Sequence, residues 1–189
     1  IFEQLRAYAP VNAQEASDRR LILQYAEQFG NLFTRKNEMA HLTASCWIVN
    51  PARTKALLAY HNIYDSWAWL GGHADGEEDL LAVALREVRE ESGVKHARPA
   101  SENIFSLEVL TVDGHEKRGA YVSSHLHLNV TYLLIADDAN VLTVKPDENS
   151  GVKWFTPEGA VEASSEKWFR EHIYNKLNEK MRQFHAEKK

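Results

Sequence analysis

Apolar residues recur at helical spacing near both ends of the chain. Residues 1–38 are therefore predicted to be helical, with Asp18 placed to cap a helix and Gly30 placed to end it. Residues 164–186 are predicted to form a closing amphipathic helix. The apolar stripe of the first segment consists of Leu21, Ile22, Tyr25 and Phe29. That of the second consists of Trp168, Phe169, Ile173, Leu177 and Met181.

The middle of the chain contains short runs that are rich in strand-forming residues. Residues 42–49 and 56–60 are separated by a turn-like cluster at 50–54, which predicts a hairpin. A polar loop is expected at 113–119. The remaining predicted strands cover 66–70, 104–112, 121–136 and 152–155, the last stopped by Pro157.

A strongly helical stretch interrupts these strands at residues 79–92. Asp79 is placed to cap its start, and Gly93 suits a left-handed residue just past its end. Its predicted core-facing stripe is Leu81, Ala84, Leu85 and Val88. The order of helix, strands, helix, strands and helix predicts an α/β (α+β) fold, in which helices cover both faces of a mixed β-sheet.

Composition and charge narrow the class of protein. The chain has 189 residues, of which 44% are apolar and 26% charged, so intrinsic disorder is excluded. We expect one domain over 1–189: a helical extension at 1–38, a core at 41–160 and a C-terminal helix at 164–189. The net charge of −5 argues against a nucleic-acid partner, and no apolar run reaches the roughly 20 residues that span a membrane. A single cysteine, Cys46, fits a reducing compartment, so the expected location is cytoplasmic.

Three carboxylates share one face of the predicted helix at 79–92. Glu87, Glu90 and Glu91 lie three and four positions apart or side by side, and their mutual repulsion is unfavourable for folding alone. Oxygen ligands suit a hard cation such as Mg²⁺, which also bridges to phosphates. Arg86 lies one turn before Glu90, where it could pair with a carboxylate. The pattern indicates a Mg²⁺ site, whereas the alternative is a solvated acidic surface.

The spacing around this helix resembles a known signature. Gly72 is followed by five residues, Glu78, seven residues, and then the run from Arg86 to Val94, which reads REVREESGV. The arrangement resembles the box of the Nudix hydrolases, with every fixed position filled. Residues 67–72 and 152–157 look like the family's strands before and after the box. Leu70 and Glu77 depart from the common proline and glycine, which affects the shape of the loop.

The resemblance implies a Nudix-type sheet, and hydrolysis of a nucleoside diphosphate linked to another moiety, with Mg²⁺ or Mn²⁺ required. A homodimer is common in the family. Glu78 and Arg86 are implied to position the ligands. The ligands implied by the family are Glu87, Glu90, Glu91 and the carbonyl of Gly71.

The general base differs between members of this family. Some members use a glutamate of the box, and others use a glutamate on a downstream loop. Glu116, in the polar loop at 113–119, and Glu148, before the last strand, are the candidates in this chain.

Several residues outside the box are candidates for substrate contacts. His125 and His127 lie on the same side of a predicted strand, and His73 follows the double glycine. Trp67 alternates with Trp69 and is a further candidate. Core packing or a polar surface is the alternative for all of them. Cys46 is expected to be a small buried hydrophobic residue.

Two other functions are compatible with such a fold. Isopentenyl diphosphate isomerases need a reactive cysteine near the double-glycine region, and Cys46 lies well before it in the sequence. A non-catalytic binding module usually loses carboxylates of the box, and this chain keeps them. The sequence leaves ADP-ribose, dinucleoside polyphosphates, oxidised nucleoside triphosphates and nucleotide sugars open as substrates.

Overall fold

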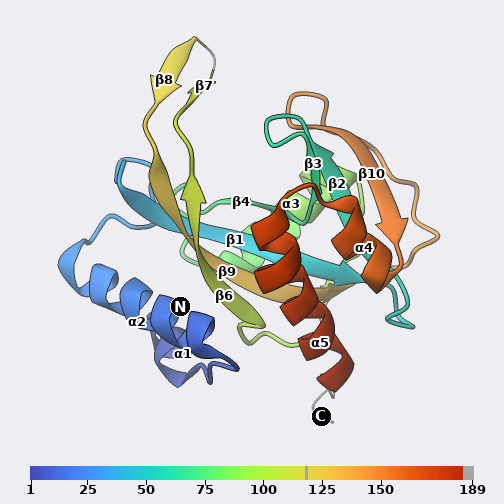
Figure 1. Ribbon diagram of the computed structural model, residues 1–189, viewed down its shortest axis with the longest axis horizontal. Coiled ribbons are helices and arrows are strands. Elements are labelled where there is room, and N and C mark those ends of the chain that lie inside the picture. Colours follow the sequence, from blue (N-terminus) through green and yellow to red (C-terminus); the bar gives the residue numbers. More distant parts are fainter. Residues whose placement is uncertain (118, 185–189) are drawn as a thin grey trace.

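The computed structural model describes residues 1–117 and 119–184 and is built around one central strand, β1 (Ala40–Val49) (Figure 1). This strand pairs in parallel with β9 (His125–Ile135) along its whole length. On its other side it pairs antiparallel with β4 (Leu70–His73) near its start and with β2 (Ala56–His61) near its end. The predicted hairpin between the first two strands is confirmed, and every residue of β1 is buried.

Shorter strands extend the sheet on both sides. β3 (Ser66–Ala68) and β10 (Asn149–Phe155) pair with β2. β5 (Arg98–Pro99) and β6 (Ser106–Val112) pair with β9. The single strand expected at 66–70 is wrong, because its first half pairs with β2 and the chain then continues into β4 beside β1.

The polar segment at 113–119 is a second departure from the sequence prediction. It contributes to a separate hairpin of β7 (His115–Lys117) and β8 (Ala120–Val122), which projects beyond the sheet at the top of Figure 1. The expected strand at 121–136 therefore divides into β8 and β9. Residue 118 lies outside the described residues.

Helices cover both faces of the sheet, as the order of elements predicted. In Figure 1, α3 (Leu80–Ser92) lies behind the sheet, and α4 (Pro157–Ala163) and α5 (Asn175–Gln183) lie in front. Successive side chains of β1 point to opposite faces of the sheet. Cys46 packs in the hydrophobic core on the α3 side, and Trp47 packs in the core on the α5 side. The sheet thus separates two hydrophobic cores.

The N-terminal segment contains two helices, α1 (Phe2–Ala7) and α2 (Ala13–Gln28). The expected cap at Asp18 is wrong, because Asn12 caps α2 by accepting the N–H of Glu15. Asp18 instead accepts the N–H of Val109 on β6 at 3.0 Å, which ties the helix to the sheet.

The predicted helix at 79–92 forms, but its buried stripe is rotated. Asp79 caps it, and Gly93 adopts a left-handed conformation with φ of 72°. Leu81 and Leu85, which the sequence placed in the core, are only partly buried. The buried residues are Leu80, Val83, Ala84, Glu87, Val88, Glu91 and Ser92. The rotation carries two glutamates of the helix toward the sheet.

The C-terminal segment is interrupted. Pro157 does not only stop β10 but begins α4, where Thr156 is the cap. A π-helical segment η1 (Phe169–Tyr174) then leads into α5, and residues 185–189 lie outside the described part of the chain. Trp168 is exposed, contrary to the predicted apolar stripe, whereas Ile173, Leu177 and Met181 are buried. Within the described ranges, no helix is long and apolar enough to cross a membrane.

Candidate active site

Three carboxylates converge where α3 faces the end of β10. Glu87 and Glu91 come from α3, and Glu148 comes from the loop that precedes β10. One oxygen from each lies within 4.8 Å of the others. Glu87 and Glu91 are each 7% exposed, whereas the side chain of Glu148 is 38% exposed. The structure therefore places two of the expected metal ligands, Glu87 and Glu91, beside Glu148, which is one of the two candidate general bases.

The two glycines of β4 allow this approach. A Cβ atom on Gly72 would lie 2.5 Å from Cδ of Glu87, and one on Gly71 would lie 2.5 Å from the carbonyl oxygen of Ala44 on β1. Gly71 thus lets β4 pair closely with β1, and Gly72 leaves room for the carboxylate. The backbone of Gly71 also acts to lower the pKa of the Glu91 carboxyl, although burial outweighs this effect.

The carboxylates carry less compensating charge than their burial requires. Burial, with the charges of Glu87 and Glu148, raises the pKa of Glu91 well above its ordinary value. Burial also raises the pKa of Glu87, although Arg86 opposes this shift. Among the described residues, Glu91 forms no ion pair. Buried oxygen donors of this kind fit a hard divalent cation, which would supply the missing positive charge.

Two basic residues border the carboxylates. Arg86 donates to Glu87 Oε1 at 2.9 Å and to the carbonyl oxygen of His73 at 3.2 Å. Lys145 Nζ lies 3.2 Å from Glu90 Oε2 and 3.0 Å from Glu148 Oε2. The sequence reasoning missed Lys145, although its spacing of three residues from Glu148 in a charged loop was a usable signal.

Glu90 lies at the rim of the carboxylate group. Its side chain is 45% exposed and contacts Lys145, with Arg86 Nε at 3.8 Å. The sequence predicted Glu90 on the same helix face as Glu87 and Glu91. In the structure Glu90 is more exposed than either of them. Glu78 is exposed at the start of the box.

The loop that carries Glu148 is fastened to the end of α3. Asn149 is buried, and its Nδ2 donates to the carbonyl oxygen of Glu91 at 3.0 Å. Its Oδ1 accepts the N–H of Lys145 at 3.2 Å. These bonds hold Glu148 beside the two glutamates of α3. Asn149 was not predicted, because its partner lies 58 residues away.

Glu116, the other candidate base, occupies a different place. It is exposed on β7 and lines the same cleft as the carboxylates, but it is not part of the close group. Glu148 is therefore better positioned to accept a proton from a water molecule at the carboxylates.

The carboxylates open into a cleft of about 760 Å³, which adjoins a second cavity of about 1020 Å³. His73 and His127 line both cavities, and His125 lines the larger one. Burial and the neighbouring histidines lower the pKa of His127 to about 2, so its ring is neutral.

The two tryptophans have different surroundings. Trp67, a predicted substrate contact, instead packs edge-on against Tyr60 and Phe155 and does not line either described cavity. Trp69 lines the cleft near Phe169, because the chain passes from the β2 side to the β1 side of the sheet between Ala68 and Leu70. The substrate contact that the sequence suggested for Trp67 is therefore better placed at Trp69.

Cys46 lies closer to the double glycine than the sequence suggested. It pairs with Leu70 across β1 and β4, and its Sγ donates to the carbonyl oxygen of Leu70 at 3.3 Å. The thiol is fully buried on the α3 side, and burial raises its pKa well above the ordinary value. A buried, neutral thiol is a poor acid or nucleophile for the cleft, and the expectation of a small buried residue is confirmed.

Comparisons with known proteins agree with this geometry. The family model described as NUDIX domain matches residues 39–177. Among curated proteins, no similar sequence was found. Three solved structures share the fold. They are a Caenorhabditis elegans Ap4A hydrolase binary complex (21% identity, TM-score 0.53, covering 76% of this chain and 96% of that one), a NUDIX-family hydrolase from Clostridium perfringens (20%, 0.52, 76% and 97%) and the Escherichia coli dihydroneopterin triphosphate pyrophosphohydrolase (13%, 0.53, 71% and 92%).

Proposed function

Because the chain belongs to the NUDIX domain family of pyrophosphate hydrolases, we propose that it is a metal-dependent pyrophosphohydrolase. Its proposed substrate is a nucleoside diphosphate linked to another moiety. The observation that supports this most directly is the convergence of the buried Glu87 and Glu91 with the partly exposed Glu148, because their mutual repulsion leaves a need for a divalent cation. The negative net charge and the buried single cysteine support a small-molecule substrate and a cytoplasmic location.

The proposed ligands for Mg²⁺ or Mn²⁺ are Glu87 and Glu91, with Glu90, Glu148 and the carbonyl of Gly71 as further oxygen donors. A dication held there would neutralise phosphate charge and would make the attacking water more acidic. Arg86 orients Glu87 through its hydrogen bond and fixes β4 through the carbonyl of His73.

Glu148 is proposed as the general base. It takes a proton from the attacking water while the water oxygen bonds to phosphorus and the phosphoanhydride bond breaks. Lys145 holds Glu148 and Glu90 in place through its two ion pairs. Asn149 is a positioning residue, because it fastens the loop to α3 without reaching the cleft. Glu116 remains an alternative base on β7.

The cleft favours a substrate with both a polyphosphate and a ring system. Two of the structural neighbours are named for such compounds, Ap4A and dihydroneopterin triphosphate. In this chain, Trp69 and Phe169 line the cleft together with the carboxylates, and an aromatic base could stack there. The proposed substrate therefore carries an aromatic base beside its polyphosphate, as dinucleoside polyphosphates and nucleoside triphosphates do.

A panel of nucleotides tests the proposal. The chain is incubated with Mg²⁺ and each substrate class, and the products are separated by chromatography. Glu91→Gln removes one buried carboxylate, and Glu27→Gln at an exposed position of α2 is the matched control. We expect phosphoanhydride cleavage in the parent and the control, abolished by EDTA. Cleavage that persists in saturating EDTA, or no cleavage of any class, would contradict the proposal.

A further inference from the structure

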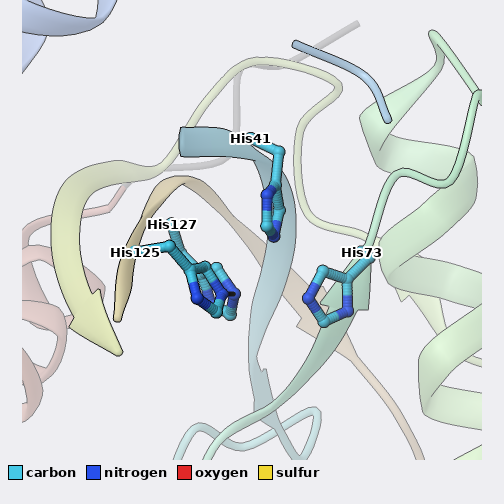
Figure 2. A group of neighbouring side chains, drawn as sticks. All are labelled: His41, His73, His125 and His127. Atoms are coloured by element: carbon cyan, nitrogen blue, oxygen red, sulfur yellow. Dashed lines mark hydrogen bonds between the residues drawn. The ribbon is translucent and has the colours of Figure 1, made fainter. Parts of the chain in front are cut away.

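Four histidines from three adjacent strands meet on one face of the sheet. His41 on β1 is directly opposite His127 on β9, and His73 on β4 is opposite Thr43, two residues further along β1. Because side chains two residues apart point to the same face of a strand, His125 joins His127. Figure 2 shows the rings of the four residues turned toward a common centre.

The spacing of these rings suits a common ligand. One ring nitrogen from each histidine lies within 4.8 Å of the others. The ring centroids are 4.9 to 5.2 Å apart in five of the pairs. The Nε2 atoms of His125 and His127 are 3.2 Å apart and form a hydrogen bond between the two rings in the metal-free protein, which a bound ion would replace. Two nitrogens bound tetrahedrally to one ion at about 2.0 Å would be roughly 3.3 Å apart, so this pair already has the required separation.

Backbone carbonyl groups fix the orientation of two of the rings. His41 Nδ1 lies 3.0 Å from the carbonyl oxygen of Asn37, and His125 Nδ1 lies 2.8 Å from that of Ser123. A carbonyl oxygen only accepts hydrogen bonds, so both Nδ1 atoms carry the proton and both neutral rings present a lone pair at Nε2. Histidines that bind metals usually donate their other N–H to such an acceptor.

Among residues 1–117 and 119–184, the Nε2 atom of His41 has no hydrogen-bond partner. The residue is only 4% exposed, so this nitrogen is buried. A buried lone pair without a partner is costly unless something binds it. His41 faces the rings of His73, His125 and His127, so the missing partner belongs at their centre.

We propose that His41, His73, His125 and His127 bind a transition-metal dication of the Zn²⁺ class at a centre separate from the carboxylates. Neutral imidazole nitrogen suits Zn²⁺ and its neighbours, whereas Mg²⁺ prefers oxygen donors. A phosphate would instead favour protonated rings, and four positive rings at these distances would repel one another strongly. The cavity of about 1020 Å³ in front of the histidines provides a path for an ion.

A second centre would lie in the same continuous cleft as the carboxylates. His73 and His127 line both cavities, and the carbonyl of His73 accepts the hydrogen bond from Arg86. An ion held by β1, β4 and β9 would stabilise the strands that form the cleft. The proposal concerns a different donor set from the hydrolytic site, and it does not depend on the hydrolytic activity.

Zinc titration of the whole chain without a histidine tag tests this inference. Metal is stripped with a chelator, and Zn²⁺ binding is then measured by calorimetry in millimolar Mg²⁺, which occupies oxygen sites. The tested variants are His125→Gln and His127→Gln. Two controls are matched: His96→Gln removes an exposed histidine outside the group, and Glu91→Gln alters the carboxylates. Circular dichroism checks that each variant folds.

We expect one tight Zn²⁺ per parent chain and a loss of affinity of about 10-fold or more in each test variant, as for disrupted metal sites. The two controls should bind like the parent. X-ray absorption should show nitrogen neighbours at about 2.0 Å. Unchanged affinity in both test variants, or a loss caused by Glu91→Gln, would overturn the proposal. The proposal would also be overturned if the histidines were required for binding of inorganic phosphate and the chain did not bind Zn²⁺.

Discussion

The described part of the chain buries carboxylates on α2 and β6 and also on α3, and the two groups differ in the positive charge that faces them. Glu15 on α2 and Glu108 on β6 are fully buried, but they meet two lysines of α5. Lys176 Nζ lies 2.9 Å from Glu108 and 3.3 Å from Glu15, and Lys180 Nζ lies 2.9 Å from Glu15. Glu87 and Glu91 are nearly as buried, yet Arg86 is the only cation that hydrogen-bonds either carboxylate among the described residues.

The pKa directions follow from this difference. Burial alone would raise the pKa of Glu15, but the charges of Lys176 and Lys180 and the N–H of Val11 bring it below the ordinary value. Burial raises the pKa of Glu91, and the neighbouring Glu87 raises it further. Buried carboxylates with their own cations fasten the fold, whereas those without them mark a place for a ligand.

The largest expected change in stability comes from removing a lysine that pairs with Glu15 and Glu108. Lys176→Met leaves Glu15 and Glu108 with Lys180 as their remaining cation. Breaking a buried ion pair typically costs about 3–5 kcal/mol. Urea unfolding should show a loss of that order, while Lys167→Met at an exposed position should change stability little. A Lys176→Met variant as stable as the parent would show that the group is not structural.

Gly72→Ala tests the carboxylates of α3, Glu87 and Glu91, which face less positive charge than those of α2 and β6. Here we expect activity to change and stability to be largely kept. The new Cβ would meet the carboxylate of Glu87, which is the movable end of a side chain, so the fold should survive while the carboxylate shifts. We expect turnover to fall by about 100-fold, as when one preorganised contact is lost. Gly30→Ala is the control, since nothing lies within 4 Å of its added Cβ. Parent-like turnover in Gly72→Ala would mean that Glu87 need not occupy its present position.

The two groups should also respond oppositely to pH in metal-free protein. The raised pKa of Glu91 means that the folded state holds a proton more tightly, so its stabilising contribution is present below about pH 4.5 and is lost as the pH rises. The lowered pKa of Glu15 contributes stability above that pH, which is lost on acidification.

Glu91→Gln cannot titrate, so it should gain stability relative to the parent as the pH rises from 5 to 7 in EDTA. The gain is limited to about 1.4 kcal/mol per pH unit. Thermal melts across this range measure it. A difference between variant and parent that stays constant with pH would show that Glu91 is already charged in the metal-free protein.

Local patterns in the sequence predicted the part of the site that one helix carries. The box spacing, the Asp79 cap and the Gly93 terminus all lie within one continuous segment, where periodicity is informative. The rotation of the helix that buries Glu87 and Glu91 was missed, because it depends on which side packs against the sheet.

Partners from distant segments could not be read from periodicity. His41 joins His127 only because β1 and β9 pair in parallel in one register, and Asn149 reaches Glu91 across two elements. Lys176 on α5 meets Glu108 on β6, which lies 68 residues earlier in the chain. The first contact depends on sheet register and the other two depend on how a helix packs against the sheet, and the pattern of a single segment determines neither.

The most direct test of the account is the effect of Mg²⁺ on the melting temperature of three proteins: the parent, Glu91→Gln and Glu108→Gln. A ligand that binds the folded state raises the melting temperature by an amount that increases with its affinity for that state. We expect Mg²⁺ to raise it clearly in the parent and less in Glu91→Gln. Glu108→Gln should start lower but show the shift of the parent. An equal Mg²⁺ shift in Glu91→Gln and the parent would contradict the claim that the carboxylates of α3 hold the metal.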